Sequence, residues 1–386
     1  MGFFLFCCMT FQLTILFNIN IYRSIIARVT PPTLNWRVNT RLSTSEENVT
    51  IKGKNKFSVY WNIPSQKCLY KYGINVDVSK YGIITNSHDG WAGEYITILP
   101  HPGLYPQVVN GTSVYGGIPQ QTNLRDHVTQ LLHDVNGRIP NKTFDGLVII
   151  DYEAWQPLWS LNFDTRRIYQ ELSVDLVKKR HPDWSPEKII STAKVEFENS
   201  ARLFLDLTIR TAIASRPGGR WGFYHYPYCF NEDTPVVGKT GCSQGAMATN
   251  NKLLWLFQSE RALYPSAYLH SPSNNTHNRL FVDARIAETK RIWEMLRKEG
   301  DVVPAYLYCT LLYKENKEFY NLVDLKNTIA KALNARLNGV VLWANHKLAK
   351  DEVTCYQLRY YVNNVLGPFV LKLLNQRKSP PPDHLS

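Results

Sequence analysis

From residue 57 onward, short apolar runs alternate with longer stretches of mixed character. Most of the apolar runs are continuous, which is typical of strands buried on both faces. They predict strands at residues 57–62, 82–85, 95–99, 147–153, 221–226, 266–270, 302–308 and 340–343. The stretches between them carry apolar stripes at helical spacing, and they predict helices at residues 123–136, 186–214, 279–298 and 324–338.

The helical stretches also carry boundary signals. Ser185 and Pro186 form a typical helix start, and a glycine follows the predicted end of each of the other helices. Strands that alternate with helices imply a parallel sheet. About eight strands over roughly 310 residues favour a closed TIM-like (β/α) barrel over an open doubly wound sheet. The lack of a glycine-rich phosphate loop also weakens the open alternative. We therefore expect an α/β fold with a single barrel domain at residues 57–375.

The two ends of the chain differ in character from this domain. Residues 3–17 are apolar but too short to span a bilayer, so residues 1–20 are interpreted as a secretory signal peptide, with an uncleaved anchor as the alternative. Residues 21–56 are expected to form a loosely structured leader, and the polar residues 376–386 a flexible tail without a lipid-anchor signal. Sequons predict glycosylation at Asn48, Asn110, Asn141 and Asn274. We expect a secreted, extracellular protein with no stable membrane anchor.

Composition narrows the class of partner. The chain is 44% hydrophobic and 20% charged, which excludes wholesale disorder, and its net charge is +12. A basic groove attracts polyanions. Because the secretory features are accompanied by no basic cluster, an anionic glycan is favoured over nucleic acid. The 12% aromatic content suits a groove that stacks sugar rings, although much of it must be core.

Five cysteines remain once the signal peptide is removed, and no two of them have zinc-ligand spacing. No metal or cofactor is therefore expected. In an oxidising compartment, two disulfides and one free thiol are the simplest outcome. Cys229 and Cys242 are close enough to close a small loop, while Cys68 and Cys355 could tie the ends of the domain together. The sequence alone leaves the pairing open.

Candidate chemistry lies at the predicted strand ends, where a (β/α) barrel places its active site. Asp151 and Glu153 follow a buried run and are two residues apart, so their side chains share a face. At about 5 Å and an effective dielectric near 20, two carboxylates repel by roughly 3 kcal/mol. One of them should therefore hold a proton and serve as a general acid. The alternative is a pair neutralised by Arg or Lys at the barrel rim. Aromatic residues at the later strand ends favour a glycosidase cleft: Tyr224, Tyr226, Tyr268, Tyr306, Tyr308 and Trp343.

These residues carry a resemblance. Residues 150–159 read IDYEAWQPLW and resemble the acid motif of the hyaluronidases of glycoside hydrolase family 56. Further similar segments are GGIPQ at 116–120, WGFYHYPYCFN at 221–231, LYPSAY at 263–268 and GVVLW at 339–343. The likeness runs from about residue 57 to 374. The chain resembles the shorter arthropod venom or salivary type, which lacks a Cys-rich C-terminal module.

The resemblance implies a distorted (β/α) barrel that hydrolyses the β-1,4 bond from N-acetylglucosamine to glucuronate in hyaluronan, and chondroitin sulfate more weakly. It implies that Glu153 is the proton donor, that Asp151 shares its proton, and that the substrate acetamido group acts as the nucleophile with retention. Tyr224, Tyr268 and Trp343 match residues that position the acetamido group, and Tyr306 matches a cleft tyrosine. The implied disulfides are Cys68–Cys355 and Cys229–Cys242, with Cys309 unpaired. A monomer is expected.

Two departures from the family pattern stand out. Gln156 occupies a position where the family usually has Arg, and its neutral amide is predicted to lie near the acid pair. No acid is found near residues 311–314, where many members carry one. The alternatives are a non-catalytic glycan-binding homologue and, less favoured, a family 18 chitinase or chitinase-like lectin. The chitinase acid motif begins with the same Asp-Gly as residues 145–146 but has a further acid that this chain lacks.

Overall fold

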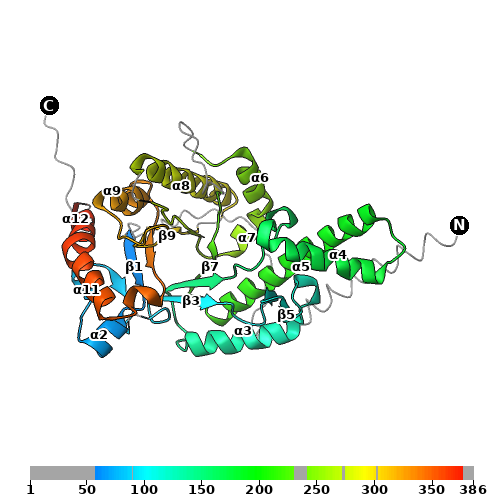
Figure 1. Ribbon diagram of the computed structural model, residues 1–386, viewed down its shortest axis with the longest axis horizontal. Coiled ribbons are helices and arrows are strands. Elements are labelled where there is room, and N and C mark those ends of the chain that lie inside the picture. The colour runs from blue at the N-terminus through cyan, green and yellow to red at the C-terminus, as the bar shows by residue number, and fades with distance from the viewer. Residues whose placement is uncertain (1–56, 89, 230–240, 272–273, 301–302, 377–386) are drawn as a thin grey trace, which may run out of the picture. The chain divides into compact units, whose positions relative to one another are not determined.

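The computed structural model describes residues 57–88, 90–229, 241–271, 274–300 and 303–376 (Figure 1). The predicted signal peptide and leader, Asn48 and residues 377–386 lie outside these ranges. The described residues all belong to one compact unit of the chain. Among them, no helix has the length and apolar character that a membrane crossing requires.

Two parallel sheets provide the strands of the barrel. One has the order β2-β1-β10-β9 and the other β3-β6-β7-β8. Parallel bridges from Leu263 to Ala305 and from Ser266 to Tyr308 join β8 to β9. A separate antiparallel hairpin, β4 with β5, follows β3. The strand bounds are β1 Ser58–Asn62, β2 Ile84–Thr85, β3 Ile96–Pro100, β4 Gln107–Val109, β5 Thr112–Val114, β6 Leu147–Asp151, β7 Arg220–His225, β8 Tyr264–Pro265, β9 Tyr306–Cys309 and β10 Gly339–Trp343.

A single side chain bridges the remaining seam of the barrel. Within the described ranges, no ladder joins β2 to β3. Instead the buried Asn86, directly after β2, donates from Nδ2 to the carbonyl oxygen of Ile96 at 2.9 Å. Its Oδ1 accepts from the backbone N–H groups of Ile96 at 3.2 Å and Tyr95 at 3.0 Å. The side-chain amide of Asn86 therefore makes the hydrogen bonds to β3 that the backbone of a neighbouring strand would otherwise make.

Helices surround the strands in Figure 1, and α4 and α5 pack lengthwise against each other. The predicted helices are confirmed, although the last one is broken by the π-helical turn Lys326–Ala330 between α9 and α10. A second π-helical turn, Val362–Leu366, lies between α11 and α12. The helix bounds are α2 Gln66–Tyr72, α3 Leu124–Arg138, α4 Arg167–Arg180, α5 Pro186–Ser215, α6 Gln244–Lys252, α7 Leu254–Ser259, α8 Asn275–Lys298, α9 Leu322–Leu325, α10 Lys331–Asn334, α11 Glu352–Tyr361 and α12 Gly367–Gln376.

Strand β6 shows why the apolar runs are continuous. Its residues alternate between two hydrophobic clusters: Val148 and Ile150 pack with the helices, and Leu147 and Ile149 pack inside the barrel. Each face is buried, so each position is apolar. Asp151 continues the inward series, because side chains two residues apart share a face. The strand thus delivers a carboxyl group to the mouth of the barrel.

The predicted strand at residues 266–270 is wrong, since β8 ends at Pro265. Proline has no N–H to donate to a ladder. Ser266 and Ala267 still contact Tyr308 of β9 through one isolated bridge, but from Leu269 the chain bonds elsewhere. The N–H of Leu269 donates to the Tyr320 hydroxyl at 2.7 Å, and its carbonyl accepts from the N–H of Lys314. From Leu269 the chain is therefore held by the segment beyond β9.

Candidate active site

A cavity of about 380 Å³ opens at the carboxyl ends of the strands. Three groups of side chains dominate its lining, and each is given a name here. The carboxyl pair is Asp151 and Glu153. The aromatic wall is Tyr224, Tyr268, Tyr308 and Trp343. The cavity cations are Arg166, Arg285 and Lys314.

The carboxyl pair is asymmetric. Asp151 is partly buried at the end of β6, while Glu153 is exposed to the cavity. Burial, followed by the charge and hydrogen bond of Glu153, raises the pKa of Asp151 from 3.8 to about 8. The pair therefore retains one proton at neutral pH, as repulsion between neighbouring carboxylates predicts. Such a pair can deliver a proton to a bound leaving group.

Backbone contacts fix the segment that carries the pair. The N–H of His101 donates to the carbonyl oxygen of Asp151 at 3.1 Å. Arg166 donates from Nε and Nη2 to the carbonyl oxygen of Glu153, each at 3.3 Å. Tyr152 and Trp155 anchor the flanking turns, with the Trp155 indole donating to the carbonyl of Pro106 at 2.7 Å. These contacts hold both carboxyl groups at the cavity.

Aromatic rings form one side of the cavity. The rings of Tyr268 and Trp343 are stacked, with nearly parallel planes that differ by 5° and centroids separated by 6.1 Å. Tyr224 lies 6.3 Å from Tyr268 and 5.4 Å from Tyr308. Burial raises the pKa of Tyr224, and that of Tyr308, so both hydroxyls stay protonated as potential donors.

Tyr306 is not brought to this cavity. It lies at the start of β9, inside the barrel, where it packs against Tyr60 and Tyr264 at 5.8 and 6.0 Å. Tyr308 points to the same face two residues later and reaches the cavity instead. Its hydroxyl is buried and has no hydrogen-bond partner among the described residues.

Gln156 also differs from expectation. Its Oε1 accepts a hydrogen bond from the Tyr226 hydroxyl, and its backbone is bound on both sides by Asn162 at 2.8 and 2.9 Å. It is not among the residues that line the cavity. Cationic character near the acid motif comes from Arg166, ten positions further along the chain, whose guanidinium binds the Glu153 backbone.

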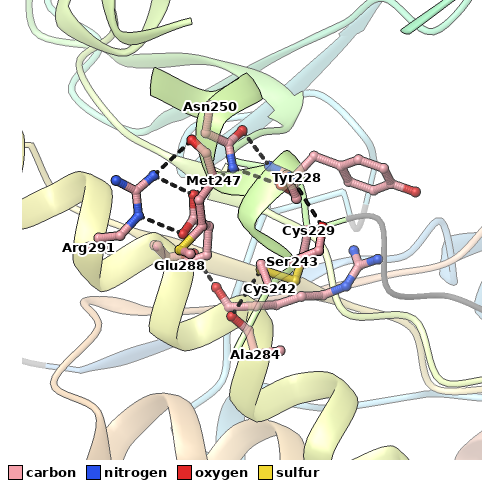
Figure 2. The surroundings of a disulfide bond; sticks show 12 residues. Tyr228, Cys229, Cys242, Ser243, Met247, Asn250, Ala284, Glu288 and Arg291 are labelled. Carbon is pink, nitrogen blue, oxygen red and sulfur yellow. Dashed lines mark hydrogen bonds and ion pairs between the residues drawn. A yellow bond between two sulfur atoms is a disulfide. The ribbon is translucent and has the colours of Figure 1, made fainter. Parts of the chain in front are cut away.

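The residues that directly follow β7, up to Cys229, are held by a buried hydrogen-bond network, shown in Figure 2. Asn250 of α6 donates to the carbonyl of Tyr228 at 2.8 Å and to Glu288 of α8 at 2.7 Å. Next to Tyr228, Cys229 forms a disulfide with Cys242. Tyr228 and Cys229 are thus tied to Asn250 of α6 and to Cys242, which lies just before that helix.

Both predicted disulfides, Cys229–Cys242 and Cys68–Cys355, are present. Cys309 is a buried free thiol, as predicted. The Cys68–Cys355 bond connects α2 to α11 across 287 residues of sequence. Asn110, Asn141 and Asn274 are exposed, so glycosylation at these positions stays a prediction that the structure permits. No group of three or more His, Cys, Asp or Glu side chains in the described ranges is arranged to hold a metal ion.

An acid pair with aromatic and basic walls at the mouth of a parallel barrel is a glycosidase geometry, and the sequence comparison decides the family. The hyaluronidase profile of glycoside hydrolase family 56 matches residues 46–379. The chain belongs to this hyaluronidase family. Its fold is accordingly the distorted TIM-like barrel that the sequence predicted.

Relatives of the hyaluronidase family match along most of this chain. The Apis mellifera hyaluronidase is 35% identical over 340 residues, covering 86% of this chain and 87% of the relative. Hyaluronidase-1 of Homo sapiens is 34% identical and covers 82% of this chain. The crystal structure of bee venom hyaluronidase in complex with a hyaluronic acid tetramer matches with a TM-score of 0.77, 34% identity and coverage of 82% of this chain and 99% of that one.

Sequence reasoning missed the cavity cations and several other residues that line the cavity. His225 and Tyr228 stand inside the quoted segment 221–231, but nothing in their spacing marks them as cavity residues. Tyr308 was noted only as one of several aromatic residues at strand ends. Arg285 comes from the middle of α8, which a barrel normally uses for packing, so only the tertiary structure could show that it lines the cavity.

Proposed function

We propose that this hyaluronidase-family enzyme is a secreted endo-glycosidase that hydrolyses the β-1,4 bond between N-acetylglucosamine and glucuronate in hyaluronan. The observation that carries the proposal is the protonated carboxyl pair in a cavity lined by both aromatic rings and cations. Sugar rings stack on aromatic faces, and a polyanion is attracted by cations. The bee venom relative crystallised with a hyaluronic acid tetramer supports the same substrate class.

Glu153 is proposed as the proton donor, because it is the member of the pair exposed to the cavity. It gives its proton to the glycosidic oxygen while the substrate's own acetamido oxygen attacks the anomeric carbon. Water then opens the cyclic intermediate and returns a proton to Glu153, which leaves the anomeric configuration retained. The Oδ1 atom of Asp151 is buried without a hydrogen-bond partner among the described residues, so it can accept from the acetamido N–H. That bond favours ionised Asp151 and moves the shared proton to Glu153.

The aromatic wall is proposed to position the acetamido group. Tyr224 and Tyr268 provide hydroxyl donors, and Trp343 provides a flat apolar face. Tyr308 takes the role that the family resemblance suggested for Tyr306. Chondroitin sulfate is proposed as a weaker substrate, since it presents a similar polyanionic chain.

The test is Glu153→Gln, which keeps the size of the side chain but cannot donate a proton. We expect turnover of hyaluronan to fall at least about a hundredfold, as for other general acids. Glu171→Gln on the exposed face of α4 is the matched control and should behave as wild type. Binding of hyaluronan should survive in Glu153→Gln. Near-normal turnover in that variant would remove Glu153 from the mechanism.

The same assay separates the alternatives. A wild-type protein that binds hyaluronan without cleaving it, on a hyaluronan-impregnated gel, would indicate a non-catalytic homologue. Digestion of chitin in its place would indicate a chitinase-like enzyme. Secretion is tested by expressing the full chain and looking for a processed form in the medium, with a mass shift on removal of N-glycans.

A further inference from the structure

His225 has a backbone conformation that its residue type rarely adopts. It is the last residue of β7 and has a φ of 84°. Residues with a Cβ avoid this left-handed region unless the surroundings impose it. Successive strand residues normally point to opposite faces, yet Tyr224 and His225 both line the cavity. The left-handed turn at His225 is what brings the second side chain round to the cavity.

The imidazole ring is held on two sides. Its Nδ1 lies 2.5 Å from Oγ of Ser266, and its ring lies 4.1 Å from that of Tyr228. Asn250 binds the backbone carbonyl of Tyr228, and the next residue, Cys229, forms the disulfide with Cys242 (Figure 2). The ring of His225 is therefore oriented by its contacts with Ser266 and Tyr228.

Ser266 and Arg285 together accommodate the His225 tautomer whose proton is on Nε2. Arg285 donates from Nη1 to the backbone oxygen of Ser266 at 2.6 Å and to its Oγ at 3.4 Å. The Ser266 hydroxyl has one hydrogen and two lone pairs, so it can donate to Nδ1 of His225 while it accepts from Arg285. The proton of the neutral imidazole then resides on Nε2, which leaves that nitrogen as a donor.

The charges around His225 keep it neutral. Burial lowers its pKa well below the usual value, and the three cavity cations lower it further. These cations come from α8, from the segment before α4 and from the loop after β9, while the carboxyl pair lines the same cavity and supplies its negative charge. An anion bound beside the ring would meet three cations and a neutral N–H donor.

We propose that His225 is a substrate-contacting residue whose Nε2–H donates to the carboxylate of a glucuronate unit, so that the cavity selects chains that carry a carboxylate. This inference rests on the proposed function and specifies how the same site recognises its substrate. The carboxylates are the anionic groups of hyaluronan, and a hydrogen bond from a neutral donor to an anion is directional. In this proposal the cavity cations attract the carboxylate, and the hydrogen bond from His225 fixes its position.

The test uses His225→Gly and His225→Asn, since both residues tolerate a left-handed backbone. Asn can still reach Ser266 from the place of Nδ1 but presents nothing at the place of Nε2. We expect KM for hyaluronan oligosaccharides to rise about tenfold to a hundredfold in both variants, the range for a hydrogen bond to a charged group, with kcat within about twofold. Arg336→Gly, at an exposed residue with a φ of 63°, controls for relief of backbone strain alone.

The substrate provides the second comparison. With oligosaccharides whose carboxylates have been reduced to alcohols, wild type and both variants should have the same KM. The proposal is overturned if His225→Asn restores the wild-type KM, because the ring would then only position Ser266. It is also overturned if the variants lose as much on the reduced substrate as on hyaluronan. A wild-type protein inactive on hyaluronan would overturn both this inference and the proposed function, whereas active wild type with unaffected variants overturns this one alone.

Discussion

The proton on the carboxyl pair should be measurable as a dependence of folding stability on pH. Asp151→Asn replaces a group that ionises with a neutral one of nearly the same shape. The pKa of Asp151 is raised from 3.8 to about 8 by burial and by Glu153. Above pH 3.8 the unfolded chain releases this proton while the folded protein retains it, so wild type loses stability as pH rises. The loss is complete once the pH passes the folded-state pKa.

The size of this effect follows from linkage. Between pH 4.5 and 7.5, each pH unit costs wild type about 1.4 kcal/mol relative to the variant, or about 4 kcal/mol in all. The assay is denaturant unfolding of both proteins at several pH values in that interval. Asp183→Asn, at an exposed carboxyl in the turn between α4 and α5, is the control and should track wild type. A difference between Asp151→Asn and wild type that stays constant with pH would show that the folded protein does not retain the proton.

The remaining predictions concern the walls of the cavity and the loop that supports it. Tyr308→Phe should lower kcat/KM for hyaluronan about tenfold, because its hydroxyl is buried at the cavity without a partner among the described residues, whereas Tyr306→Phe should leave steady-state kinetics unchanged. Equal effects of the two variants would contradict the placement of these tyrosines. Because salt screens the cavity cations, KM for hyaluronan should rise from low to physiological ionic strength, and a KM that does not move would separate them from binding. Replacing both Cys229 and Cys242 with Ser should lower the free energy of unfolding by about 3 kcal/mol in the chain-entropy model, and unchanged stability in equilibrium denaturation would refute this.

The barrel and its acid pair could be predicted because they depend on local pattern. A run such as β6, apolar at each position and ending in an acid, indicates both a buried strand and a carboxyl group at its mouth. Helix α5 was equally predictable, since Ser185 caps it and Pro186 begins it. Helix α4 was missed because Arg166 precedes it without a side-chain cap, and its sequence is largely polar.

Other features depend on contacts between distant segments. The end of β8 is decided by bonds from residues 269–270 to the loop after β9, which no local pattern records. Tyr306 and Tyr308 share one face of β9, and only Tyr308, which lies nearer the carboxyl end of the strand, reaches the cavity. Gln156 was expected beside the acids because it is near them in sequence, but its side chain binds Tyr226. The left-handed conformation of His225 is accompanied by contacts of its ring with Ser266 and Tyr228.

The seam at Asn86 has a consequence for the order in which the barrel comes apart. Elsewhere neighbouring strands are joined by ladders or backbone bridges, whereas here one amide side chain makes the connection. Rotation of that single side chain would break the hydrogen bond of the Ile96 N–H without disturbing any ladder between strands. In native-state hydrogen exchange, the Ile96 amide should therefore open through a smaller fluctuation than the amides of β6 or β10. The first breach of the cylinder would then begin between its second and third strands.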